Sequence, residues 1–205
     1  CNIAIGRSAL GGADVSGDDN IALGRASMDA LTSGACNIAL GLNALGASTD
    51  GNDNIAIGES ALAVSDGSGN QNIAIGKTAM GGADVSGGIN VAISSNALDA
   101  LTTGTYNVAI GNNALGAATD NHCNIAIGVS ALAASDGDGD NNVAIGTSAL
   151  GGADVSGASN IAIGSNAADA MTSGGYNIAM GVNALGEGQT GSNNIALGQL
   201  AIGTG

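Results

Sequence analysis

The sequence predicts an all-β protein, a parallel β-solenoid (β-roll) of about twelve coils with 17 or 18 residues each. A five-residue motif, Asn-Ile-Ala-Ile-Gly, starts at Asn2 and occurs, with small changes, in twelve copies at that spacing. A short apolar segment that recurs at a fixed period near 18 is typical of a solenoid. Composition agrees with this prediction. The absence of Pro, Phe and Trp excludes a conventional aromatic core, and 44% hydrophobic residues exclude a disordered linker.

Each motif is expected to form a strand, because its residues alternate with period two. Ile3 and Ile5 then point to one face of the strand. Asn2, Ala4 and Gly6 point to the other. Gly at the end of the strand suits a turn that needs positive φ or a close backbone approach. The short Ala-Leu segment that follows is expected to form the opposing wall of the coil.

The first residue of the motif is Asn in all twelve copies. If each repeat is one turn of the solenoid, equivalent residues stack about 4.8 Å apart. The side-chain amides can then hydrogen-bond along the stack, as Asn ladders do in cross-β structures. The expected structural ladder consists of Asn2, Asn20, Asn37, Asn54, Asn72, Asn90, Asn107, Asn124, Asn142, Asn160, Asn177 and Asn194.

One face of the strand carries large apolar side chains and the other carries small ones, and this difference allows two interpretations. In the first, the Ile ladder fills the coil interior, and the Ala face is exposed or docks on something flat. In the second, the small residues line a thin interior and the Ile ladder packs against other chains. We favour the second, because an exposed face has no evident reason to be Ala in all twelve copies. It predicts an oligomer with an apolar core on its symmetry axis.

The spacers between motifs repeat over a longer distance. Gly-Gly-Ala-Asp-Val-Ser-Gly occurs at 11–17, 81–87 and 151–157, an offset of 70 residues. Four coils therefore form a module, at about 2–71, 72–141 and 142–205, with the last incomplete. We expect a single solenoid array over 1–205, a rod on the order of 55 to 60 Å long. Neither end resembles a polar cap, so we interpret the chain as a segment of a larger protein.

Charge and hydropathy narrow the range of partners. The chain has 17 acidic residues against three basic ones, Arg7, Arg25 and Lys77, and a net charge of −14. This balance excludes nucleic acid, whose binding needs Lys and Arg along the backbone, and anionic membrane surfaces. No apolar run of about 18 residues exists, so no membrane insertion is expected in this segment. The acids fall mainly in the spacers, where they favour solubility.

One acidic spacer has a second interpretation as a calcium site. Asp136, Asp138 and Asp140 alternate with Gly, as oxygen ligands do at the start of an EF-hand loop. No Glu follows at the twelfth position, and no flanking helices are expected. The three aspartates are thus a calcium candidate beside the simpler interpretation of a solvated loop, and no other cofactor is expected.

The position just before each Asn holds all three cysteines, Cys1, Cys36 and Cys123, and both tyrosines, Tyr106 and Tyr176. Cys1 and Cys36 are two coils apart, about 9 to 10 Å, which exceeds the separation that a disulfide spans. We therefore expect no intrachain disulfide and predict packed thiols at this edge, with contacts between chains or free thiols as the alternatives. The tyrosines are expected to cover the same edge, and sugar stacking is their alternative role.

Catalysis is not expected. His122 is the only His, and it is adjacent to Cys123. A Cys–His pair needs side chains that face each other, whereas neighbours on an extended chain point apart. The chain also has no Gly-rich loop followed by Lys at the start of a helix, as a phosphate site requires.

The pattern Asn-x-Ala-Ile-Gly-x-x-Ala resembles the head repeat of trimeric autotransporter adhesins, the YadA-like left-handed parallel β-roll. It also resembles repeat arrays of bacterial and phage tail-fibre-like proteins. The resemblance covers all twelve units, although the adhesin repeat is commonly shorter, so a longer outer loop is expected here. It implies a homotrimer of parallel chains and a secreted protein of the cell surface or a virion fibre.

Three functions follow from these observations. The first is a structural repeat region of an extracellular fibre or adhesin, a stiff shaft or head that attaches through its outer loops. The second is an ice-binding solenoid, which the flat Ala and Asn array favours but the lack of a Thr-x-Thr ladder disfavours. The third is a calcium-dependent surface-layer or matrix protein, which depends on the acidic loops.

Overall fold

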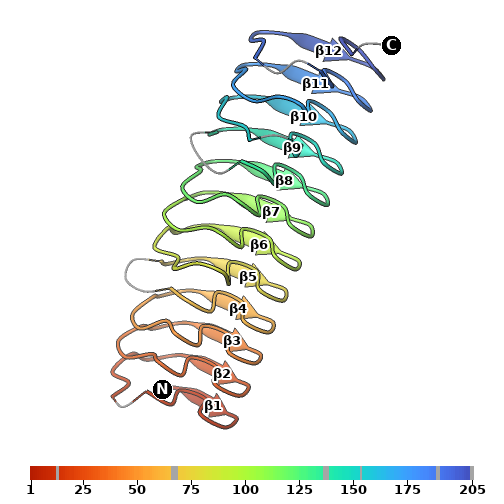
Figure 1. Ribbon diagram of the computed structural model, residues 1–205. Coiled ribbons are helices and arrows are strands. Elements are labelled where there is room, and N and C mark those ends of the chain that lie inside the picture. The colour runs from red at the N-terminus through yellow and green to blue at the C-terminus, as the bar shows by residue number, and fades with distance from the viewer. Residues whose placement is uncertain (13, 66–68, 136–138, 153, 188–189, 204–205) are drawn as a thin grey trace.

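The structure, a computed structural model, describes residues 1–12, 14–65, 69–135, 139–152, 154–187 and 190–203. Twelve three-residue strands stack into one elongated solenoid, with the two termini at opposite ends (Figure 1). The strands are β1 (Ile3–Ile5), β2 (Ile21–Leu23), β3 (Ile38–Leu40), β4 (Ile55–Ile57), β5 (Ile73–Ile75), β6 (Val91–Ile93), β7 (Val108–Ile110), β8 (Ile125–Ile127), β9 (Val143–Ile145), β10 (Ile161–Ile163), β11 (Ile178–Met180) and β12 (Ile195–Leu197). The prediction of an all-β parallel solenoid is confirmed.

The strands form a single sheet in sequence order, and each pairs in parallel with the strand before and after it. The register places every Ala opposite the Ala of the next coil, as with Ala109 and Ala126. Each coil therefore contributes one strand, and turns and loops make up the rest of its path. In the described part of the chain no helix forms. Accordingly, that part holds no helical segment that is long and apolar enough to cross a membrane.

The interior is thin and is filled by columns of equivalent residues. The strand Ala forms one column, buried in β2 to β12. Two more columns follow the strands and are buried in the second to eleventh coils: one of Ala, with Ser27 in the second coil, and one of Leu or Met, with Ala168 in the tenth. In β7 and the turn after it, these are Ala109, Ala114 and Leu115, all fully buried. Leu31, Leu101 and Met171 are 70 positions apart and are all buried. Residues at this spacing therefore occupy equivalent positions in the solenoid.

The turns use left-handed backbone conformations at residues other than Gly, which the sequence did not indicate. In the seventh coil, Tyr106 has φ 62°, Asn113 has φ 57° and Leu115 has φ 49°. The same three positions recur around the stack. Such conformations disfavour residues with a Cβ, so the packing and hydrogen bonds of the stack must offset their cost.

The strand-end Gly also has positive φ, as expected from the sequence. Gly6, for example, has φ 135°, and a Cβ added there would lie 2.4 Å from the carbonyl oxygen of Gly24. The sixth coil is the exception, because Ser94 takes this place with φ 106°.

Candidate interaction surface

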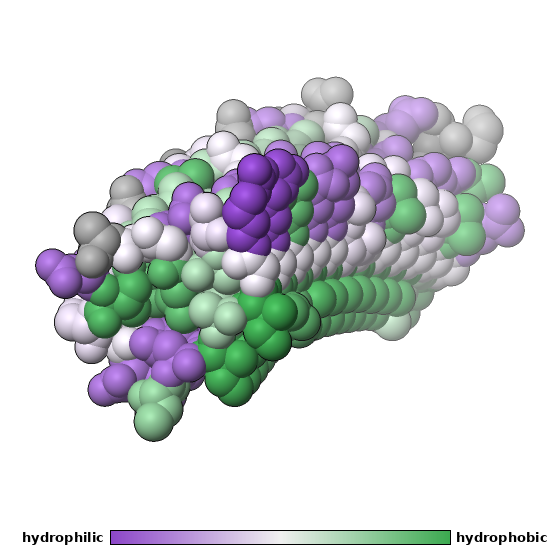
Figure 2. All heavy atoms as spheres, turned by 90° about the horizontal axis from the view of Figure 1, so that it is seen from below, coloured by the Kyte–Doolittle hydropathy of each residue, from purple (hydrophilic) through white to green (hydrophobic). Residues whose placement is uncertain are grey.

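The outer face of the sheet is a continuous apolar stripe. In β2 to β12 the central Ala is buried, whereas the two flanking Ile, Val, Leu or Met residues are half-buried or exposed. Ile5 is 60% exposed and Leu197 is 64% exposed, at opposite ends of the stack. Figure 2 shows these side chains as an unbroken hydrophobic stripe along the molecule. We call these flanking strand residues the apolar stripe.

The stripe settles the orientation of the strand. Small residues line the interior and the large apolar residues face outward, so the second of the two predicted orientations is confirmed. The stripe is on the order of 55 Å by 10 Å, or roughly 500 Å², from the spacing of strands and of alternate side chains. The largest apolar patch on a typical monomeric protein is of about this size, and such a patch is often functional.

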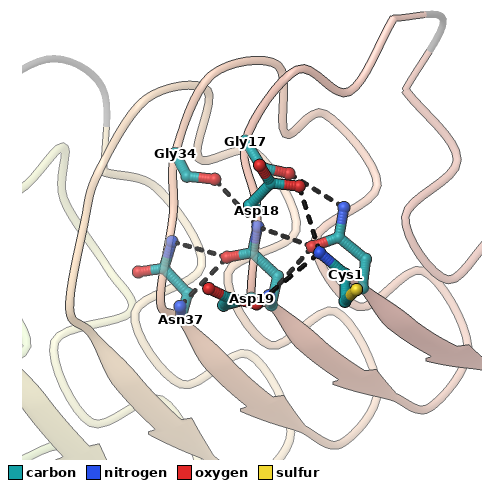
Figure 3. A network of polar contacts seen from close by, with 8 residues as sticks. Cys1, Gly17, Asp18, Asp19, Gly34 and Asn37 are labelled. Carbon is teal, nitrogen blue, oxygen red and sulfur yellow. Dashed lines mark hydrogen bonds and ion pairs between the residues drawn. The ribbon is translucent and has the colours of Figure 1, made fainter.

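Buried asparagines fix the strand that carries the stripe. The amide Nδ2 of Asn20 donates to Asn2 Oδ1 at 3.2 Å and to the carbonyl oxygen of Gly34 at 2.9 Å (Figure 3). Its Oδ1 accepts from the backbone N–H of Asn37 at 3.0 Å and from the Asn37 amide at 3.1 Å. Asn20 thus joins the coil before it, its own coil and the coil after it.

This backbone-to-side-chain bond continues through the whole stack. At all eleven steps from Asn2 to Asn194, the N–H of one Asn donates to the side-chain oxygen one coil earlier, at 2.8–3.0 Å. Because buried polar groups need partners, the ladder holds every strand in the same register.

The ladder is imperfect in the seventh and eighth coils. A Gly carbonyl usually accepts from the Asn amide of its own coil, but in the seventh coil the acceptor is the carbonyl of Asn121. The amide of Asn121 donates to Ser135 Oγ at 2.9 Å and to the carbonyl of Gly139 at 3.2 Å. Asn121 Oδ1 and Asn124 Nδ2 are buried without a partner.

One edge of the stripe is formed by the residue that precedes each Asn, and we call it the leading edge. Its members are Cys1, Asp19, Cys36, Asp53, Gln71, Ile89, Tyr106, Cys123, Asn141, Ser159, Tyr176 and Asn193. All are exposed except Ser159, which is half-buried. The left-handed φ of these residues, recorded from Asp19 onward, turns the chain into each strand.

The cysteines of the leading edge do not pack as predicted. Cys1, Cys36 and Cys123 are all free thiols and exposed, so the prediction of packed thiols is wrong for this chain alone. Cys36 and Cys123 have left-handed φ values of 60° and 59° at the residue that leads into each strand. Tyr106 is 56% exposed and Tyr176 is 68% exposed.

The opposite edge is formed by the residue after the strand-end Gly (Ser94 in the sixth coil), and we call it the trailing edge. Its members are Arg7, Arg25, Leu42, Glu59, Lys77, Ser95, Asn112, Val129, Thr147, Ser165, Val182 and Gln199. All three basic residues of the chain belong to it. Lys77 Nζ lies 3.4 Å from Glu59 Oε2. A shallow, open hollow lies beside Arg7, Arg25 and Leu42.

The trailing edge was not identified from the sequence. The signal was available, because Arg7, Arg25 and Lys77 share one phase of the repeat.

The calcium candidate is only partly described. Asp136 and Asp138 lie outside the described residues. Asp140 Oδ1 accepts a hydrogen bond from the backbone N–H of His122 at 2.6 Å, so it already joins adjacent coils. Among the residues that the structure describes, no three His, Cys, Asp or Glu side chains form a group that would hold a metal ion.

His122 takes part in a second, shorter polar ladder. The backbone N–H of Thr105 donates to His122 Nδ1 at 3.1 Å, and the Thr105 hydroxyl lies 2.8 Å from the same nitrogen. Nδ1 must therefore be unprotonated, with the proton on Nε2. The same pattern joins Ala35 to Asn52, whose side-chain oxygen accepts from the Ala35 N–H at 2.9 Å.

The amino group of Cys1 contacts this side of the stack as well (Figure 3). It donates to Asp18 Oδ1 at 3.1 Å and lies 3.5 Å from Asp19 Oδ1. The hydrogen bond to Asp18 raises the pKa of that amino group.

Comparisons with known proteins give no match. No family model matches the chain, and neither a curated protein nor a solved structure is significantly similar to it.

Proposed function

We propose that the chain is a structural repeat region of an extracellular fibre or adhesin, in which parallel chains assemble as a homotrimer through the apolar stripe. The observation that supports this most strongly is the stripe itself, which lies outside the coil along all twelve strands. At about 25 cal/mol per Å², covering roughly 500 Å² corresponds to on the order of 10 kcal/mol per chain, before the cost of association.

The ladder supports a mechanical role. Eleven consecutive Asn steps and the in-register strands connect every coil to its neighbours, as expected for a stiff rod. Attachment to a surface or cell is assigned to the outer loops, where the acidic spacers lie. The resemblance of the motif to adhesin head repeats is the reason for proposing three chains and an extracellular location.

The alternative functions have less support in this fold. The ice-binding alternative depended on a flat outer array of Ala and Asn, and both columns are buried over most of the stack. The calcium alternative depended on Asp136 and Asp138, outside the described residues, and on Asp140, which bonds to His122. No specific observation favours either one.

The test compares the mass in solution of the native chain with that of a stripe variant. Replacing Ile75, Ile93, Ile110 and Ile127 by Thr keeps β-branched residues in the strands while making the centre of the stripe polar. We expect the native chain to be an assembly and the variant to be a folded monomer of 19.1 kDa. The control is Leu200→Ser, because Leu200 is 45% exposed but lies outside the stripe.

Circular dichroism establishes that each variant keeps its strands. The proposal is overturned if the folded stripe variant retains the mass of the native assembly, or if the control variant dissociates to the same extent.

A further inference from the structure

The leading and trailing edges correspond in chemical character in seven of the twelve coils. In the second coil the leading residue is Asp19 and the trailing residue is Arg25. The three apolar trailing residues, Leu42, Val129 and Val182, share their coils with Cys36, Cys123 and Tyr176. The ninth, tenth and twelfth coils have uncharged polar residues at both edges. The first, fourth, fifth, sixth and seventh coils do not follow the pattern.

Contacts within one chain do not account for this correspondence. The two edge residues of a coil are separated by the extended segment from Asn to Gly, as between Cys123 and Val129. At about 3.3 Å per residue this segment alone spans roughly 13 Å. The pairs do meet if the leading edge of one chain lies against the trailing edge of another at the same level.

We propose that the leading edge of each chain packs on the trailing edge of the next chain, with equivalent coils level, around a closed ring. This inference rests on the proposed assembly through the apolar stripe and adds which edges meet and in which register. Rotation about an axis along the solenoid keeps each coil level with its own copies, so a head-to-tail interface of this kind closes without shifting the register.

The apolar stripe alone is smaller than a typical stable interface, which supports a contribution from both edges. A specific interface buries about 800 Å² per partner, whereas the stripe offers roughly 500 Å². The stripe must also serve two neighbours in a ring. Exposed side chains such as Tyr176, Val129 and Val182, at 68%, 50% and 46%, supply further apolar area on both sides of it.

Charge complementarity supports the contact in the second coil. Arg25 is exposed on the trailing edge, and Asp19 on the leading edge has a side chain that is 71% exposed, although it also lies near the Cys1 amino group. The fourth coil would place Asp53 opposite Glu59, but Lys77 from the next coil lies 3.4 Å from Glu59 and offsets its charge. Complementary edges of this kind select the register and suppress other arrangements.

A cross-link between edges tests the register directly. In a chain whose Cys1 and Cys36 are changed to Ser, the substitution Val129→Cys adds a thiol to the trailing edge, level with native Cys123. Oxygen with a copper–phenanthroline catalyst accepts the two electrons and two protons released as each disulfide forms. We expect covalent species up to a closed trimer on non-reducing gels, because every chain then carries one thiol at each edge.

The matched control places the new thiol one coil away. Thr147→Cys, in the same Cys1→Ser and Cys36→Ser background, belongs to the trailing edge of the ninth coil and is expected to cross-link at least tenfold more slowly. A second test exchanges the charges of Asp19 and Arg25. Asp19→Arg or Arg25→Asp alone is expected to weaken association about tenfold or more, and the double exchange to restore it.

The outcomes separate the two proposals. If the native chain assembles but Val129→Cys links no faster than Thr147→Cys, the edge pairing is wrong and the stripe assembly stands. If linkage stops at dimers through Cys123 alone, the chains meet by a two-fold contact, and the head-to-tail inference is overturned. A native chain that stays monomeric overturns both.

Discussion

Replacing Asn90 by Ala removes a complete step of the buried ladder near the middle of the stack. The Asn90 amide donates to Asn72 Oδ1 at 3.1 Å, to the Gly104 carbonyl at 2.9 Å and to the Gly88 carbonyl at 3.2 Å. Its Oδ1 accepts from the backbone N–H and the amide of Asn107 at 2.9 and 3.1 Å. The substitution therefore leaves a buried donor at Asn107 and a buried acceptor at Gly104 without their partners.

The expected loss of stability follows from these two groups. A buried donor or acceptor without a partner costs about 1–3 kcal/mol, so we expect the free energy of unfolding to fall by about 3–5 kcal/mol once the lost packing is included. Urea unfolding followed by circular dichroism measures this free energy. The protein concentration is kept the same for all variants, because association shifts the apparent stability. The control is Thr103→Ala, since Thr103 is exposed and lies outside the apolar stripe and both of its edges.

The control is expected to change stability by less than about 0.5 kcal/mol. A cost for Asn90→Ala that is no larger than that of Thr103→Ala would show that the ladder does not stabilise the fold.

Three further predictions concern single buried or strained positions. Ala109→Leu adds bulk to the thin interior, where Ala109 is fully buried, and should destabilise the fold by about 1–3 kcal/mol or more; an unchanged melting temperature would contradict it. Ser94→Gly removes a side chain from φ 106°, where the other coils have Gly, and should stabilise by about 1 kcal/mol in urea unfolding, whereas destabilisation would show that the Ser is not strained. Asp99 has a buried Oδ1 without a hydrogen-bond partner. Burial raises the pKa of this carboxyl above 3.8, whereas a hydrogen bond involving the Gly82 backbone lowers it. Because the folded pKa is raised, the cost is present at neutral pH and is relieved as the pH falls through that pKa. Asp99→Asn should therefore be more stable than the native chain at pH 7, by at most about 1 kcal/mol because the group is partly solvated, and the difference should shrink on acidification; a constant difference would contradict it.

Much of the fold follows from the repeat alone. The period of 17 or 18 residues predicts one strand per coil, and the invariant Ala at the centre of each strand predicts which face is inside. Ala109 and its equivalents are buried, and only a small side chain fits between the strand and the opposing wall. The sequence shows this constraint because the position is Ala in all twelve repeats.

The edges of the stripe could not be predicted in the same way. Leu115 at φ 49° and Tyr106 at φ 62° hold left-handed conformations that sequence patterns assign to Gly or Asn, so the path of the turns was not visible. The exposure of Cys36 and Cys123 depends on that path. Residues at these positions vary in chemistry from coil to coil, and their common role emerges only when the strands are stacked.

The measurement that tests the central claim most directly is the mass of the native chain in solution, by light scattering over a range of concentrations. The account predicts a mass near three times 19.1 kDa, because the apolar stripe is then covered by two further copies. A mass of 19.1 kDa at every concentration would contradict it, since the stripe would then remain exposed to water along all twelve strands.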